Sequence, residues 1–160
     1  MKLSQIGTTA VATLAAATGV GIASAPAASA DAYPVFKKFG NQERLNDSDG
    51  AVITGWTVSN LRPSNDPIPY QPRGHLWEAD ATVRAIRGNV QPIIPDFNAR
   101  AANGDNYPEL GNVATAQGMN PAVVNQGDER SGKLYFDVVG PNPNSVVYDA
   151  GGRDLLFWTR

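Results

Sequence analysis

Short runs of β-branched and aromatic residues, each followed by a cluster of Asn, Asp, Gly or Pro, recur along the chain from residue 31 onward. No stretch of this region keeps apolar residues at the spacing of an amphipathic helix, because prolines and glycines interrupt it. Runs bounded by such turn-forming clusters are typical of β-strands. The pattern predicts eight strands, over residues 33–39, 51–59, 76–86, 94–100, 106–110, 133–139, 145–148 and 154–158.

Strands that follow one another without helices favour one architecture. A parallel connection needs a dozen or more residues to cross over, whereas short turns join antiparallel strands. The prediction is therefore an all-β fold, an antiparallel β-sandwich in which one face of each sheet packs on the core.

Alternation along the predicted strands assigns side chains to the core or to water. The residues expected to face the core together are Leu134, Phe136 and Val138 in one strand, Val52, Trp56 and Val58 in another, and Trp77, Ala79, Ala81, Val83 and Ala85 in the longest. The residues expected to face water beside the first set are Lys133, Tyr135 and Asp137. The last strand, "DLLFW", is apolar on both faces, which predicts a central or covered position. We expect all three tryptophans, the third being Trp158, to be substantially buried.

The first thirty residues have a different pattern. Lys2 is followed by an uncharged run of small and apolar residues, 10–25, and then by the sequence Ala28-Ser29-Ala30. This order predicts a secretory signal peptide over residues 1–30, cleaved before Asp31, and a mature domain over residues 31–160. The run is too rich in Ala, Gly and Thr for a good membrane anchor, and no second long apolar segment follows. We expect a secreted protein without a membrane span.

Composition narrows the functional classes. The mature chain of 130 residues suits one domain and contains no cysteine, so its stability must come from the core rather than from disulfides. Without Lys2 it carries twelve basic and fifteen acidic residues, a net charge of −3. A mildly acidic chain without a basic run argues against nucleic acid and anionic membrane surfaces as partners. No cofactor is predicted.

The segment "GDERSGKL", residues 127–134, resembles a phosphate-binding loop because Gly127 precedes Gly132 and Lys133 at nearly the required spacing. Such a loop needs Ser or Thr after the lysine and a helix whose N-terminus faces the phosphate. Here Leu134 follows, and the next residues alternate as a strand. We interpret the segment as a polar turn that leads into a strand.

The single histidine, His75, lies close in sequence to Glu78 and Asp80, which suggests a metal site, a hydrolase triad or a glycosidase carboxylate pair. Strand alternation places His75 on one face and both carboxylates on the other, so a regular strand opposes a metal site. The chain lacks a G-x-S-x-G nucleophile motif. Paired carboxylates on one face have a compatible spacing, but a small sandwich has little room for a sugar cleft. We therefore predict a protein that is not an enzyme, and no catalytic or metal residue.

The segment "NDSDG", residues 46–50, places Asp47 and Asp49 at alternate positions, as in a calcium loop, but lacks the closing bidentate Glu. Asp105 and Asp128 would have to contribute from other loops. An Asp/Gly turn is the preferred interpretation.

The segment "PSNDPIPYQP", residues 63–72, contains four prolines in ten residues, which makes it stiff and extended. Ile68 and Tyr70 are the residues that it would present as an interaction surface. The alternative, which we prefer from sequence alone, is a long connection whose apolar residues fold back onto the sandwich.

Several segments also resemble a known family. "GWTVSNL", "LWEADATVRAIRGNVQP", "FNARAANGDNY", "GKLYFDVVGPNP" and "DLLFW" follow the signal peptide in the order and spacing of the MPT63 family of small secreted immunogenic proteins of mycobacteria. The resemblance covers essentially the whole mature chain and is weakest over residues 111–126. It implies an immunoglobulin-like β-sandwich, export, recognition by host immunity and an actinobacterial source. It implies no catalytic residue, because the biochemical function of the family is not established.

Two functions are therefore compared. The favoured one is a secreted, immunogenic, non-enzymatic module that binds a host or cell-envelope protein through end loops or a sheet edge. The alternative is an extracellular binder of a small apolar ligand or of calcium. An enzyme that uses Glu78 and Asp80 is the least favoured.

Overall fold

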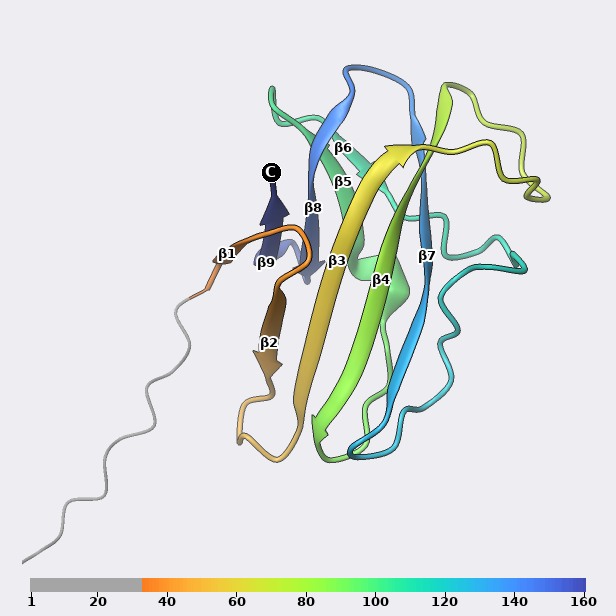
Figure 1. Cartoon of the computed structure of the whole chain (residues 1–160). Coiled ribbons are helices and arrows are strands. Elements are labelled where there is room, and N and C mark those ends of the chain that lie inside the picture. Colours follow the sequence, from red (N-terminus) through yellow and green to blue (C-terminus); the bar gives the residue numbers. More distant parts are fainter. Residues whose placement is uncertain (1–32) are drawn as a thin grey trace, which may run out of the picture. The chain divides into compact units, whose positions relative to one another are not determined.

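Residues 33–160 are described in the computed structural model, so the predicted signal peptide, residues 1–30, lies outside the described residues. The described residues form two β-sheets (Figure 1). The strands are β1 (Val35–Lys38), β2 (Gln42–Asn46), β3 (Ile53–Pro63), β4 (His75–Arg87), β5 (Phe97–Ala101), β6 (Asn106–Pro108), β7 (Glu129–Val138), β8 (Pro143–Ala150) and β9 (Arg153–Thr159). A five-stranded sheet has the order β1-β9-β8-β5-β6, and a four-stranded sheet has the order β2-β3-β4-β7.

The all-β class and the sandwich architecture are confirmed. All strand pairs of both sheets are antiparallel except one, because β1 pairs with β9 in parallel, with Val35 opposite Leu156. The expectation of a purely antiparallel fold was wrong at this pair. The crossover argument applies to strands that follow one another, whereas β1 and β9 are the first and last strands and the whole fold connects them.

Strand β2 was missed from the sequence. Three of its five residues are Gln42, Glu43 and Arg44, a composition that does not indicate a strand. It pairs with β3 and places Glu43 opposite Trp56. Of the two positions of β2 on the core side, Leu45 is apolar, but the more buried one is occupied by the Glu43 carboxyl.

The predicted strand over residues 94–100 begins as a short 3₁₀ helix, η1 (Ile94–Asp96), before β5 starts. Pro95 lies in its first turn, where a fixed φ suits a helix and the missing N–H is not needed. In the segment "GDERSGKL" the strand starts earlier than predicted, at Glu129 rather than Lys133. No helix follows Lys133, as expected of a turn and strand.

The core lies between the sheets and is rich in aromatic side chains. The three tryptophans are buried, as predicted, with exposed fractions of 1%, 5% and 0% for Trp56, Trp77 and Trp158. The Trp56 ring packs edge-on against Phe97 with centroids 4.8 Å apart. Alternation predicted the core face of β4 correctly, because its five assigned residues are all buried. Val52 is an exception: it precedes β3 and is half-buried.

The outer face of the four-stranded sheet differs from the prediction. Tyr135 and Asp137, expected in water, are 2% and 9% exposed. The two ends of the connection between β3 and β4 cover them, since the Tyr70 hydroxyl donates a hydrogen bond to Asp137 and the Tyr135 hydroxyl donates one to Asp66. A strand whose polar face is covered by a loop cannot be recognised from its own alternation. Strand β9, which is apolar on both faces, is not an edge strand but lies between β1 and β8, as predicted.

Candidate functional site

A loop of residues 64–74 joins β3 to β4 and extends away from the sandwich (Figure 1). Pro67 and Pro69 are exposed along it, whereas Ile68 and Tyr70 are half-buried. The two candidate contact residues are therefore partly withdrawn from solvent, which agrees with the preferred sequence interpretation. What distinguishes the loop is how its two ends are fastened.

Asp137 of β7 fastens the end of the loop that leads into β4. Its carboxylate accepts hydrogen bonds from the Tyr70 hydroxyl and from the backbone N–H groups of Arg73 and Gly74, each at 2.9 Å. Burial acts to raise the pKa of Asp137, but the donors from Arg73, Gly74 and Tyr70 outweigh it and lower the pKa. A carboxylate held by several donors keeps its charge even when it is buried.

Gly74 makes this fastening possible. A Cβ at this position would lie 2.0 Å from the backbone oxygen of Val138. The backbone of the loop therefore passes against β7 at a distance that no side chain permits, and the N–H of Gly74 reaches Asp137.

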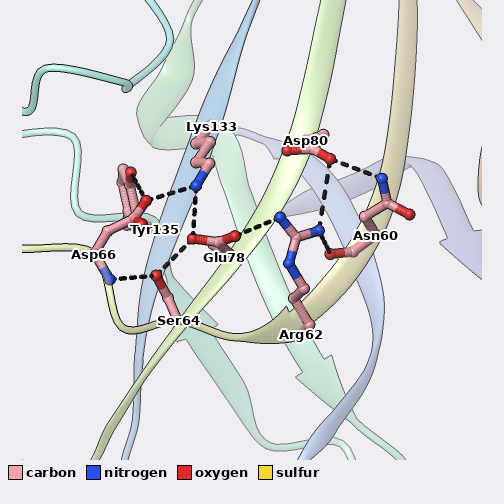
Figure 2. Close-up of polar contacts among 8 residues, drawn as sticks. All are labelled: Asn60, Arg62, Ser64, Asp66, Glu78, Asp80, Lys133 and Tyr135. Carbon is pink, nitrogen blue, oxygen red and sulfur yellow. Dashed lines mark hydrogen bonds and ion pairs between the residues drawn. The ribbon is translucent and has the colours of Figure 1, made fainter.

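A cluster of charged residues fastens the other end of the loop, on the outer face of the sheet (Figure 2). Glu78 of β4 lies at its centre. Its Oε2 accepts hydrogen bonds from the Ser64 hydroxyl at 2.5 Å and from the Lys133 ammonium at 3.1 Å. Its Oε1 lies 2.6 Å from the Arg62 guanidinium, which comes from β3. Three segments thus converge on one buried carboxylate.

Asp66, the next acidic residue of the cluster, belongs to the loop itself. It accepts a hydrogen bond from the Lys133 ammonium at 2.6 Å and another from the Tyr135 hydroxyl at 2.7 Å. The hydrogen bond from Lys133, followed by that from Tyr135, lowers the pKa of Asp66. Burial, followed by the bond to Asp66, raises the pKa of Tyr135. These two pKa shifts favour an ionised Asp66 that accepts a hydrogen bond from a neutral Tyr135.

A β-bulge in β3 directs the remaining members of the cluster. The pairing of β3 with β4 shifts between Ser59 and Arg62, and Asn60 has a positive φ of 54°. Bulges redirect side chains in this way. Asn60 donates a hydrogen bond to Asp80 at 2.7 Å, and Arg62 lies 3.6 Å from the same carboxylate.

We call this cluster of Asn60, Arg62, Ser64, Asp66, Glu78, Asp80, Lys133 and Tyr135 the clamp. It combines two cations, Arg62 and Lys133, with three carboxylates that all have partners (Figure 2). Glu78 and Asp80 share the outer face, as alternation predicted, but both contact Arg62. Their observed role in this arrangement is to bind the cations that hold the loop.

The other candidate site residues lie apart from this clamp. His75 is the exposed first residue of β4. Asp47 and Asp49 close the turn between β2 and β3, where their carboxylates accept hydrogen bonds from Val52 and Ala51. Within residues 33–160, no group of three His, Asp or Glu side chains has an arrangement that could hold a metal ion. Asp105 and Asp128 belong to separate turns and do not join Asp47.

Sequence reasoning missed most of the clamp. The residues that bind one another in the clamp lie far apart in the sequence. Ser64 binds Glu78, 14 positions away, and Asp66 binds Lys133 and Tyr135, 67 and 69 positions away. No local pattern links them. The single available signal was the occurrence of polar residues on one face of β4 and β7, and that signal was interpreted as a solvent-facing surface.

Fold and site together define a class of protein: an immunoglobulin-like β-sandwich that carries a clamped, proline-rich loop. The chain belongs to the family described as a domain of unknown function (DUF1942), whose model matches residues 34–158. It is 45% identical over 159 residues to the immunogenic protein MPB63 of Mycobacterium bovis, a match that covers 99% of each chain. The match to the immunogenic protein MPT63 of Mycobacterium tuberculosis has the same identity and coverage.

A solved structure gives the same result. The crystal structure of MPT63, described as a secreted protein from Mycobacterium tuberculosis, matches with a TM-score of 0.77 and 45% identity. The match covers 81% of this chain and 99% of that chain. The resemblance inferred from the sequence is confirmed, and the chain is related to mycobacterial antigens. The names of these relatives state immunogenicity and no enzymatic activity.

Among residues 33–160, no helix is long and apolar enough to cross a membrane.

Proposed function

We propose that the protein acts outside the cell as a non-enzymatic module that binds a host or cell-envelope protein through the loop of residues 64–74. The observation that carries the proposal is the combination of reach and rigidity. The loop projects from the sandwich (Figure 1), and the clamp and Asp137 hold its two ends. A loop ordered before binding loses less conformational entropy when a partner docks, which raises affinity.

The extracellular location is supported by two independent features. The signal peptide predicted over residues 1–30 would direct export, and the matched crystal structure is that of a secreted protein. An exported domain without cysteine must be stable through its core, which the three buried tryptophans supply.

The sheet edges offer less to a partner than the loop does. The outer edge of β7 is already occupied: Leu110 and Met119 donate backbone hydrogen bonds to Tyr135 and Lys133, each at 2.9 Å. The other three edge strands, β1, β2 and β6, are four, five and three residues long. Addition of a partner strand needs a row of free backbone groups. We therefore assign recognition to the loop.

Affinity capture tests the proposal, with residues 31–160 as bait against cell-envelope extract and host-cell lysate. The informative comparison is between Ile68→Ser, which changes the loop, and Val123→Ser, which removes an exposed apolar side chain from a different loop. We expect a saturable protein partner that Ile68→Ser weakens at least tenfold, about 1.4 kcal/mol, and that Val123→Ser leaves unchanged. Equal binding by both variants would remove the loop as the contact.

A second variant tests the contribution of rigidity. Tyr70→Phe keeps the ring and removes the hydroxyl that binds Asp137. We expect slower association of the partner, because the loop must then be ordered during binding. An unchanged association rate would indicate that the fastening at Asp137 serves stability alone.

The alternative function, a binder of small ligands, keeps one supporting feature, a pocket beside β7. This pocket contains no residue of the loop 64–74 in its lining.

A further inference from the structure

A pocket of about 740 Å³ lies between the segment that contains η1 and the connection from β6 to β7. Its lining combines apolar residues, among them Pro92, Ile94, Pro95, Val113, Ala114 and Met119, with the polar residues Asn112, Thr115 and Asn120. This volume falls within the range of small-molecule sites in proteins. A carboxyl group, that of Glu109, is part of the lining.

The walls of the pocket are held in place by the sheets. Glu109 donates its backbone N–H to Phe97 at 2.9 Å, and Met119 donates to Lys133 at the same distance. The Gln91 side chain donates a hydrogen bond to the Pro121 carbonyl, which links the two sides of the pocket. The pocket is therefore bounded by fastened backbone and does not depend on a free loop.

The Glu109 carboxyl is incompletely satisfied. Its Oε2 is buried and has no hydrogen-bond partner. A buried polar atom without a partner is unfavourable, and such atoms in native structures call for a physical explanation. Burial raises the pKa of Glu109 to about 7, against the opposing effect of the Tyr135 backbone. A cationic donor placed beside Oε2 would satisfy this oxygen and stabilise its charged form.

Gly111 packs closely against the Glu109 carboxyl. A Cβ at this position would lie 3.0 Å from the Glu109 Oε2 and 2.9 Å from the Cγ of Pro95. The backbone of Gly111 does not have a positive φ, so its conformation does not require glycine. Any larger residue would crowd the carboxyl against the wall that Pro95 forms.

We propose that this pocket binds a small amphiphilic cation, a protonated amine with an apolar body, whose ammonium group pairs with the Glu109 carboxylate. The apolar body lies against Ile94, Val113 and Met119. An alcohol of the same shape gains the apolar contacts but not the charged hydrogen bond, and a carboxylate of the same shape is repelled by Glu109. The site is distinct from the proposed partner-binding loop and does not rest on that function.

Titration of the folded protein with hexylamine, hexanol and hexanoate, followed by amide NMR, tests the proposal. We expect hexylamine to shift the amides of Gly111, Gly118 and Met119 and to bind about tenfold or more tightly than hexanol. Hexanoate should bind most weakly. Equal affinities for the amine and the alcohol, or shifts confined to other parts of the sandwich, would overturn the proposal.

Two variants locate the interaction. Glu109→Gln preserves the shape and should abolish the preference for the amine, while Glu129→Gln, at the exposed start of β7, should leave it unchanged. Gly111→Ala should weaken amine binding by filling the space beside Oε2. Retention of the amine preference in Glu109→Gln would contradict the assignment.

A measurement on the unaltered protein makes the test independent of how the variants fold. The pKa of Glu109 can be followed by carbon NMR of its carboxyl group, with and without hexylamine. We expect the bound amine to lower the pKa from about 7, because the ammonium favours the carboxylate. An unchanged pKa at saturating amine would exclude the ion pair.

Discussion

Both faces of the four-stranded sheet bury carboxyl groups, but they do so in opposite ways. The inner face buries aromatic and aliphatic side chains around Trp56 and includes one carboxyl, Glu43, whose oxygens accept no hydrogen bond of good geometry. The outer face buries Glu78 and Asp137, each with several donors. The comparison shows that a carboxyl can be buried with hydrogen-bond donors around it or without them.

The pKa values of Glu43 and Asp137 shift in opposite directions. Burial raises the pKa of Glu43 to about 7, and the opposing effects of the Phe157 backbone and of Lys37 are smaller. On the outer face burial also acts to raise the pKa of Asp137, but the hydrogen-bond donors around the carboxylate lower the pKa below its usual value. Burial with few partners thus leaves Glu43 about half ionised near pH 7, whereas the donors around Asp137 keep that carboxyl ionised.

The largest expected effect concerns the inner face. Trp56→Ala should lower the free energy of unfolding by about 3–5 kcal/mol, because it leaves a cavity next to Phe97 and Tyr148. Urea titration monitored by the remaining tryptophans measures this. A loss below about 1 kcal/mol would mean that Trp56 does not organise the inner face.

The next effect is on the pH dependence of stability. The pKa of Glu43 is about 7 in the folded protein and near 4.5 when unfolded, so folding becomes less favourable as pH rises from 4.5 to 7 and is constant above. The shift corresponds to roughly 3 kcal/mol. The pKa of Glu109 is also raised to about 7, so Glu109 likewise makes folding less favourable as the pH rises. Glu43→Gln should remove the contribution of Glu43 to this dependence of stability on pH. Urea midpoints at pH 5, 6, 7 and 8 measure it.

The control for this prediction is Glu129→Gln, which changes an exposed carboxyl. The stability of this variant should depend on pH in the same way as that of the unaltered protein. A wild-type stability that rises steadily from pH 5 to pH 8 would show that Glu43 finds a partner in solution, and the contrast between the two faces would then be lost.

A smaller effect is expected when the clamp is broken. Glu78→Gln should lower stability by about 2 kcal/mol, through loss of charged hydrogen bonds. The loss stays below the 3–5 kcal/mol typical of a fully buried pair, since Lys133 keeps Asp66 and the Arg62 side chain is 45% exposed. Hydrogen exchange of residues 64–74 should accelerate in this variant. Unchanged exchange would show that the loop does not depend on the clamp.

The smallest effect concerns Tyr135, whose hydroxyl donates a hydrogen bond to Asp66. Tyr135→Phe should lower stability by about 1 kcal/mol, because Asp66 keeps its ion pair with Lys133 and is partly solvated. Thermal unfolding at neutral pH measures this. A loss as large as that of Glu78→Gln would place the centre of the clamp at Asp66.

Most strands could be predicted because each is a local pattern. The apolar alternation of β4 and the turn clusters around it are sufficient to place its core face, and all of its assigned core residues are buried. β2 could not be predicted, because its most buried residue is Glu43 and three of its five residues are polar or charged in a run, Gln42 to Arg44. The clamp could not be predicted either, because Ser64, Asp66 and Lys133 meet only when two strands and a loop are assembled.

The sequence by itself determined the all-β class, the positions of most strands, the burial of the tryptophans and the relationship to secreted mycobacterial antigens. These properties depend on residue periodicity and on order along the chain. The tertiary structure decided the parallel pairing of β1 with β9, the covering of Tyr135 and Asp137, and the isolation of Glu43 and Glu109. These depend on which distant segments meet, since neighbours in space determine whether a buried charge finds a partner.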